Sequence, residues 1–213
     1  MYKRQSGLSE KTINTDLAIK ATDLLAKEGI TAAVTRIGDY RATLGFRTSF
    51  AAAAKPEALV SIHHNADPDG PMDRPGTETY YQIASAGSKR LAGLIYEETI
   101  RALSPLGAKW VGDTDAGAKW RPGRNGADYY GILRQARQAN LTAVLAEMAF
   151  VSNPSEEALL AKEQTRRLEA GALAKAVTRY LRTKDPGSGY TTPYPRKEPA
   201  GPGGGRSGCT DPG

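Results

Sequence analysis

The stretch Ala58-Leu59-Val60-Ser61-Ile62-His63-His64-Asn65 decides the fold, because an apolar run ends on two histidines and an asparagine. Residues 58–62 have the length and composition of a strand buried in a sheet. In folds where strands alternate with helices, ligands bind beyond the carboxyl ends of the strands. The stretch therefore predicts a buried strand and a candidate site directly after it.

The sequence on either side alternates between helical and strand patterns. We expect helices over residues 12–27, 44–54, 88–103, a short one capped by Ser155, and 164–181. We expect strands over residues 31–35, 58–62, 77–83 and 142–146, and a long polar, Gly-rich loop over 111–129. Strands alternating with helices predict an α/β sandwich.

The composition changes near Lys184. The 213 residues suit one domain of ordinary size with a tail. Residues 184–213 contain six Pro and eight Gly in thirty residues, too few apolar groups to offset the entropy of ordering. We expect a folded domain over residues 1–183 and a disordered tail over 184–213.

Charge and apolar patterning exclude several classes of protein. No long uncharged apolar run is present, so a transmembrane helix is not expected, and no apolar segment of signal-peptide type follows the basic residues at the start. The single cysteine, Cys209, excludes an internal disulfide and a cysteine zinc cluster. The net charge of +6 fits an anionic partner, but it is the sole support for nucleic-acid binding, which we do not expect.

The two histidines admit two interpretations. Neutral imidazole is a common zinc ligand, so His63 or His64 at a strand end suits a metal site. Alternation along a strand sends neighbouring side chains to opposite faces, so at most one of them faces a given site. A pair of partly buried, hydrogen-bonded histidines explains the pattern equally well.

Two glutamates are further candidates. Glu147 ends the apolar run 142–146, and a carboxylate there is costly to bury unless it is paired, metal-bound or protonated. It suits general acid–base work, but a buried salt bridge is an alternative. Glu10 precedes a helix, where a carboxylate also simply offsets the helix dipole.

These elements, in this order, resemble the zinc-dependent N-acetylmuramoyl-L-alanine amidases of the amidase_3 family. The resemblance spans roughly residues 7–182 and rests on seven elements in register. They are Glu10-Lys11 with Asn14, Thr35-Arg36 with Asp39, Leu44 with Arg47, Ser61-Ile62-His63 with Asn65-Ala66, Gly76 with Glu78 and Tyr80, Leu133-Arg134, and Glu147 with Phe150, Ser152 and Asn153.

The resemblance implies a fold and a set of roles. The fold would be a three-layer α/β/α sandwich around a mixed, mostly parallel sheet. Glu10 and His63 would be zinc ligands, and Glu147 would be the catalytic carboxylate beside the metal. Asn65 and Arg134 would contact substrate or orient the site, whereas His64 occupies a variable position and receives no role.

One departure from the family pattern is large. The family begins with a strand that ends in an Asp-Pro-Gly-His-Gly-Gly motif, whose His is the first zinc ligand, and nothing in this sequence matches it. We expect that motif to lie upstream of Met1, so the domain would be N-terminally incomplete. It would lack the first family strand, with a gap or an exposed edge in the sheet, and one of three protein ligands.

The implied activity is zinc-dependent hydrolysis of the amide between N-acetylmuramic acid and L-alanine in peptidoglycan, by an autolysin or a phage-type lysin. Zinc would activate water and polarise the carbonyl, while Glu147 moves the proton to the leaving amine. The alternative is a truncated or non-catalytic relative that binds cell wall only. The substrate implies action outside the cytoplasm, and we expect a monomer.

Basic and aromatic residues also gather between residues 110 and 130. Lys119, Trp120, Arg121 and Arg124 suit binding of stem-peptide carboxylates and sugar. A solvated surface loop is the alternative.

Overall fold

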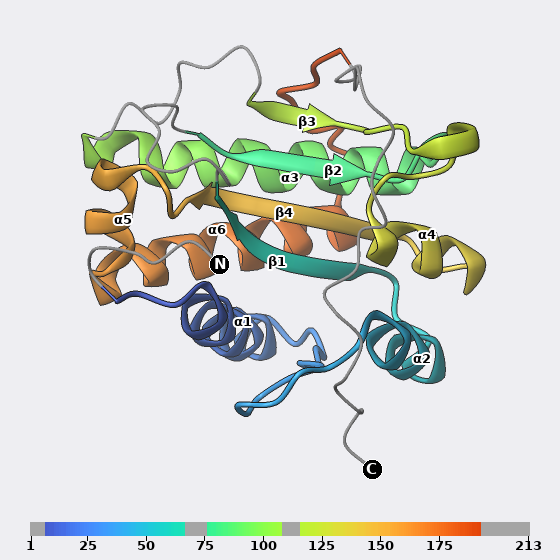
Figure 1. The fold of residues 1–213 in the computed structure, drawn as a ribbon, viewed down its shortest axis with the longest axis horizontal. Coiled ribbons are helices and arrows are strands. Elements are labelled where there is room, and N and C mark those ends of the chain that lie inside the picture. The colour runs from blue at the N-terminus through green and yellow to red at the C-terminus, as the bar shows by residue number, and fades with distance from the viewer. Residues whose placement is uncertain (1–6, 67–75, 108–115, 193–213) are drawn as a thin grey trace.

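The computed structural model describes residues 7–66, 76–107 and 116–192 (Figure 1). Its helices are α1 (Glu10–Lys27), α2 (Leu44–Ala54), α3 (Ala86–Leu103), α4 (Gly131–Gln138), α5 (Pro154–Leu160) and α6 (Glu163–Arg182). Its strands are β1 (Leu59–Asn65), β2 (Glu78–Tyr81), β3 (Gly117–Lys119) and β4 (Ala143–Phe150). The expected helices are all present, with bounds shifted by a few residues.

The four strands form one mixed sheet in the order β1-β4-β2-β3. β1 runs parallel to β4, and β2 runs parallel to β3, whereas β2 and β4 are antiparallel. The predicted fold class, an α/β fold around a mixed, mostly parallel sheet, is confirmed.

Alternation along β4 builds a core on each face of the sheet. Val144 and Ala146 pack into a cluster with apolar residues of α1, α3 and α6. Leu145 points to the other face and packs with α2 and α4. In Figure 1, α3 and α6 run behind the sheet, whereas α2 and α4 stand at the end where β1 and β4 begin. These two helices thus stand at the opposite end of the sheet from the carboxyl ends of β1 and β4.

The N-cap of helix α5 lies two residues earlier than expected. Asn153, not Ser155, is the N-cap, and its side-chain oxygen accepts hydrogen bonds from the Ser155 and Glu156 amides at 2.9 and 3.3 Å. An Asn side chain at this position satisfies the free amides of the first turn. Pro154 then occupies the first helical position, where a missing amide does no harm.

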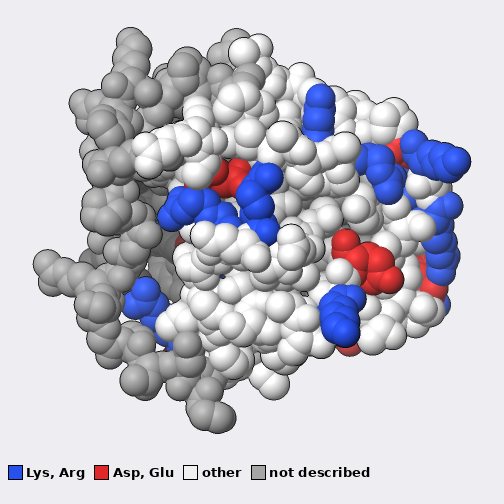
Figure 2. Space-filling model, turned by 90° about the vertical axis from the view of Figure 1, so that its right-hand side faces the viewer, with Lys and Arg blue, Asp and Glu red and all other residues white. Residues whose placement is uncertain are grey.

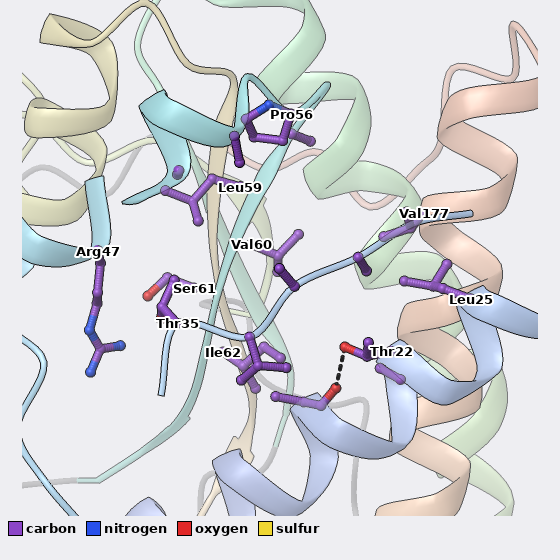
Figure 3. A pocket seen from close by; sticks show the side chains of 18 of the residues that line it. Thr22, Leu25, Thr35, Arg47, Pro56, Leu59, Val60, Ser61, Ile62 and Val177 are labelled. Carbon is purple, nitrogen blue, oxygen red and sulfur yellow. Dashed lines mark hydrogen bonds between the residues drawn. The ribbon is translucent and has the colours of Figure 1, made fainter. Parts of the chain in front are cut away.

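The strand expected over residues 31–35 does not form, so that prediction was wrong. The segment and β1 instead line the same cavity of about 410 Å³, together with α1, α2 and α6. In Figure 3, Val60 and Ile62 point toward α1 and α6, whereas Leu59 and Ser61 point toward the side of Arg47. A β-branched run favours a strand only where another strand pairs with its backbone. Among the described strands, none lies between this segment and β1, which is an edge of the sheet.

The segment after α6 departs from the expected disordered tail. Residues 184–192 lie against α3 and the outer edge of β3, where the Ala118 amide donates to Gly189 O at 2.8 Å and the Thr191 amide donates to Ala118 O at 3.0 Å. Arg90 of α3 also donates to Asp185 O at 3.3 Å. The composition of this segment predicts little burial. Its order comes from contacts with distant parts of the chain, namely these backbone hydrogen bonds and the close approach of Gly187 and Gly189 to α3. Residues 193–213 of the expected tail lie outside the described residues.

The next two features are the apolar length of the helices and the distribution of charge on the surface. None of the helices in the described ranges is long and apolar enough to cross a membrane. On the face shown in Figure 2, Lys and Arg side chains are spread out and interspersed with Asp and Glu, so this face carries no continuous basic patch.

Candidate active site

Three candidate side chains form one row across the sheet. In the strand register His63 of β1 is opposite Glu147 of β4, and Glu147 is opposite Glu78 of β2. Residues directly opposite one another project from the same face of a sheet. The row lies on the α2–α4 face, beyond the apolar cluster that those two helices cover.

Helix α1 brings Glu10 to this row at its first turn. The Glu10 oxygen Oε1 lies 3.0 Å from His63 Nδ1, and it accepts hydrogen bonds at 3.2 Å from both the His64 amide and Asn14 Nδ2. All three contacts are made to the same oxygen.

The charges of Glu10 and His63 stabilise one another. Burial by itself would raise the pKa of Glu10, but the His63 hydrogen bond and charge, with the His64 amide and Asn14, lower it to about 2. Burial by itself would lower the pKa of His63, but the Glu10 contact and the charges of Glu147 and Glu10 raise it above its ordinary value. These shifts favour the charged forms of both side chains.

Glu147 is the unsatisfied group of the row. Its oxygen Oε2 is buried and has no hydrogen-bond partner among the described residues. Burial raises its pKa to about 8; the His63 charge opposes the shift, whereas the charges of Glu10 and Glu78 add to it. A buried carboxyl without a partner is a functional-site signature when it faces other titratable groups.

Asn65 is linked to the row by a hydrogen-bond network around Glu78. Glu78 accepts from Asn65 Nδ2 at 2.8 Å, from the Tyr80 hydroxyl at 3.0 Å and from Lys119 Nζ at 2.6 Å. Sequence reasoning did not select Glu78 as a site residue. Two features of the sequence could have indicated Glu78. It belongs to the Gly76–Tyr81 element of the family pattern, and it lies two positions before Tyr80, so both side chains project from the same face of the strand.

Part of the basic and aromatic stretch is buried rather than solvated. Lys119 lies in β3 with only 2% of its side chain exposed, and its ammonium pairs with Glu78. The Arg121 guanidinium stacks on the Tyr129 ring at 4.1 Å and lies 5.9 Å from the Tyr130 ring. Burial is the main reason that the pKa of Tyr130 is raised to about 12. The predicted loop over 111–129 thus contains a strand, and residues 108–115 lie outside the described residues.

Arg134 does not join the row in the structure. Its guanidinium donates to the backbone oxygens of Asp128 and Tyr129, the former at 2.9 Å. The side chain therefore fastens the segment before α4, which carries Tyr130. The other expected substrate-side residue, Asn65, contacts the row through Glu78.

The two histidines point to opposite faces, as strand alternation predicts. His63 faces the row, whereas the His64 ring is buried between α1 and α6 and contacts Asn14 and Glu169. The family pattern gave His64 no role, and the row does not use its ring.

The spacing of the Glu10 and His63 donor atoms fits zinc. Glu10 Oε1 and His63 Nδ1 are 3.0 Å apart, and two ligand atoms of a tetrahedral zinc are about 3.3 Å apart if its bonds are near 2.05 Å. The unsatisfied Glu147 oxygen beside them suits a site that receives a cation. Among the described residues no group of three or more His, Cys, Asp or Glu side chains could hold a metal ion, so Glu10, His63 and Glu147 do not by themselves form a three-ligand cage. The row thus provides two zinc-type ligands and an adjacent carboxylate.

Known proteins that are similar to this chain show its family. The model of the Amidase_3 family, described as N-acetylmuramoyl-L-alanine amidase, matches residues 2–179. The chain belongs to the N-acetylmuramoyl-L-alanine amidase family. Family membership confirms the predicted class of enzyme, a peptidoglycan amidase, and the predicted fold.

Individual relatives of this amidase family show how far the similarity extends. The amidase LytC of Bacillus subtilis (strain 168) is 30% identical over 179 residues, 83% of this chain and 32% of LytC. YqiI of the same strain, described as an uncharacterized protein, is 31% identical over 177 residues, 82% of this chain and 76% of YqiI. The crystal structure of an N-acetylmuramoyl-L-alanine amidase from Clostridium difficile 630 has a TM-score of 0.69 and 28% identity, with 84% of this chain and 87% of that chain covered. The chain thus spans about a third of LytC but most of YqiI.

Proposed function

We propose that the His63–Glu147 row hydrolyses the amide between N-acetylmuramic acid and L-alanine of peptidoglycan, with a zinc ion held by Glu10 and His63. The observation that carries the proposal is the 3.0 Å contact between Glu10 Oε1 and His63 Nδ1 beside the unsatisfied oxygen of Glu147. When bound, zinc supplies Lewis-acid activation of water and of the scissile carbonyl.

Glu147 is the proton carrier in this proposal. Its buried carboxyl has a pKa raised to about 8 in the metal-free protein, so it holds a proton readily near neutral pH. A nearby cation would favour its ionised form, which accepts a proton from water. The same carboxyl then returns the proton to the departing amine of L-alanine.

The other residues orient the site. Asn65 connects the end of β1 to Glu78 and so holds the row in register. Arg134 fixes the backbone before α4 and with it the Tyr130 side of the site. We assign both residues to positioning of the substrate-binding surface, with no step of proton transfer.

The proposed substrate implies a binding partner and a cellular location for the enzyme. Peptidoglycan is the partner, and the enzyme acts outside the cytoplasm as a monomer. In this proposal residues 1–183 carry the catalytic domain, and the segment beyond residue 192 is a tail. Sedimentation velocity in the presence of zinc measures the oligomeric state and so tests the proposed monomer.

Mass spectrometry of purified muropeptides tests the activity. Incubation with the 213-residue chain and zinc is expected to release free stem peptide. Glu147→Ala should abolish release, and a chelator should do the same until zinc is restored. Asp23→Asn, an exposed carboxylate further along α1, is the matched control and should leave release unchanged.

A cell-wall binder without catalysis is the alternative outcome. A folded chain that sediments with peptidoglycan yet releases no stem peptide in excess zinc would overturn the proposed activity. That result would leave family membership intact, because membership rests on the sequence match.

A further inference from the structure

A buried polar chain leads away from the row on the opposite face of β1. His64 is 2% exposed, and its Nδ1 lies 2.7 Å from Asn14 Oδ1 of α1. Its Nε2 lies 3.1 Å from Glu169 Oε1 of α6, and the side chains of His64 and Glu169 are fully buried. The proposed reaction uses neither of these groups.

The contacts of His64 determine which way the Asn14 amide points. An amide oxygen only accepts hydrogen bonds, so the proton of the His64–Asn14 contact lies on Nδ1. With its oxygen turned toward His64, Asn14 turns its NH₂ toward Glu10, where Nδ2 donates to Oε1 at 3.2 Å. A flip of the amide would direct its oxygen at the Glu10 carboxylate.

We propose that His64 is a positioning residue that holds Glu10 in place through Asn14. This inference rests on the proposed function in one respect: the position of Glu10 matters because Glu10 is a proposed zinc ligand. The Asn14 contact is one of three hydrogen bonds to Glu10 Oε1, so it helps to fix the Glu10 carboxylate beside His63. Groups that orient a metal ligand from behind commonly change metal affinity 10–100-fold.

Glu169 anchors the far end of the chain. Its Oε1 contacts His64 Nε2 and so fixes the plane of the ring, whereas its Oε2 is buried without a hydrogen-bond partner among the described residues. A buried carboxylate with one unsatisfied oxygen is costly for stability, and an apolar pair of similar volume would usually be no less stable. A role in the geometry of Glu10 explains why the pair is polar.

Two substitutions of His64 separate positioning from packing. In His64→Asn the side-chain amide replaces the Nδ1 side of the ring, so it still donates to Asn14 but loses Glu169. In His64→Gln the longer amide reaches the Nε2 side, so it still contacts Glu169 but no longer fixes Asn14. Both variants are polar and leave space unfilled, so a merely structural role would affect them alike.

Two readouts report on Glu10, one of them without metal. The backbone amide of residue 64 donates to Glu10 Oε1 at 3.2 Å, so its hydrogen-exchange rate in the metal-free protein reports whether Glu10 is held. Competition titration with a zinc-binding dye gives the zinc affinity. We expect His64→Gln to accelerate exchange at residue 64 and weaken zinc binding about tenfold, whereas His64→Asn stays within about threefold of wild type.

The outcomes distinguish this inference from the proposed function. Equal changes in the two variants, or none in either, would overturn the positioning role, with unfolding in urea showing that both are folded. If wild type binds no zinc, the proposed function fails, and the exchange rates in the metal-free protein still decide the role of His64.

Discussion

His63 and Glu147 are direct partners in the parallel ladder between β1 and β4. Parallel pairing brings together two residues that are far apart in the sequence, and it sends both side chains to one face. The third participant, Glu10, arrives from the first turn of α1. The site is therefore held by the sheet and one helix end rather than by a loop, which favours a rigid arrangement.

Loss of either proposed ligand should abolish zinc binding. We expect Glu10→Gln and His63→Ala each to weaken zinc affinity by more than about 100-fold, because even residues behind the ligands commonly contribute 10–100-fold. Competition titration against a chromophoric chelator measures this. Asp23→Asn should bind zinc as wild type does. Zinc affinity that is unchanged in both ligand variants would place the metal elsewhere.

Glu147 should make the metal-free protein less stable as the pH rises. Its pKa is about 8 in the folded state against an ordinary value of 4.5, so stability associated with the protonated carboxyl is present below 4.5 and is lost as the pH rises toward 8. Glu147→Gln removes this loss. We expect it to raise the free energy of unfolding at pH 8 by about 1–3 kcal/mol, with little change at pH 4. Urea unfolding across this pH range checks the slope, and parallel pH profiles of the two proteins would contradict the assignment.

The buried pair of Lys119 and Glu78 should respond asymmetrically to substitution. Lys119→Met leaves a buried carboxylate without its cation, and we expect a loss of about 3–5 kcal/mol in the free energy of unfolding. The double variant Lys119→Met with Glu78→Gln should recover part of that loss, since the charge is gone. Urea denaturation of the wild type, of Lys119→Met and Glu78→Gln alone, and of the double variant measures the coupling. Simple additivity of the two single losses would show that the ion pair is not the relevant contact.

Two glycines should respond to alanine with opposite signs. Gly189 has a φ of +77°, and a Cβ there would lie 2.0 Å from the Tyr96 ring, so Gly189→Ala should lower the melting temperature as the 184–192 segment is displaced. Gly171 in α6 has open space around it, and Gly171→Ala should raise stability by about 0.5–1 kcal/mol. Thermal unfolding decides both, and an unchanged melting temperature for Gly189→Ala would show that the segment is dispensable.

Much of the fold was predictable, because its signals are local. The helices follow from apolar spacing, and the buried strands follow from short apolar runs such as 58–62. The strand over 31–35 was wrong because pairing with a neighbouring strand, rather than β-branched content, decides whether a strand forms. The packing of 184–192 was missed for the converse reason, because its glycines permit close contacts that its composition does not suggest.

The candidate site was predictable in composition more than in arrangement. Alternation along a strand predicts that the side chains of His63 and His64 lie on opposite faces of the sheet, and the structure shows this arrangement. Spacing gives no sign that Glu78 joins the row, that Lys119 is buried against it, or that Arg134 turns to the backbone of residues 128–129. These are properties of strand register and loop path, which depend on contacts between distant parts of the chain.

The edge of β1 that pairs with no described strand bears on how the protein behaves in concentrated solution. The other edge of the sheet is covered by residues 184–192, whereas the β1 edge borders the 410 Å³ cavity and lacks another described strand beside it. Open apolar edges promote strand-to-strand association between molecules. Mutual repulsion from the net charge of +6 opposes that association and weakens as salt screens it. Colloidal stability should therefore fall with ionic strength, so low-salt buffers suit storage of this amidase.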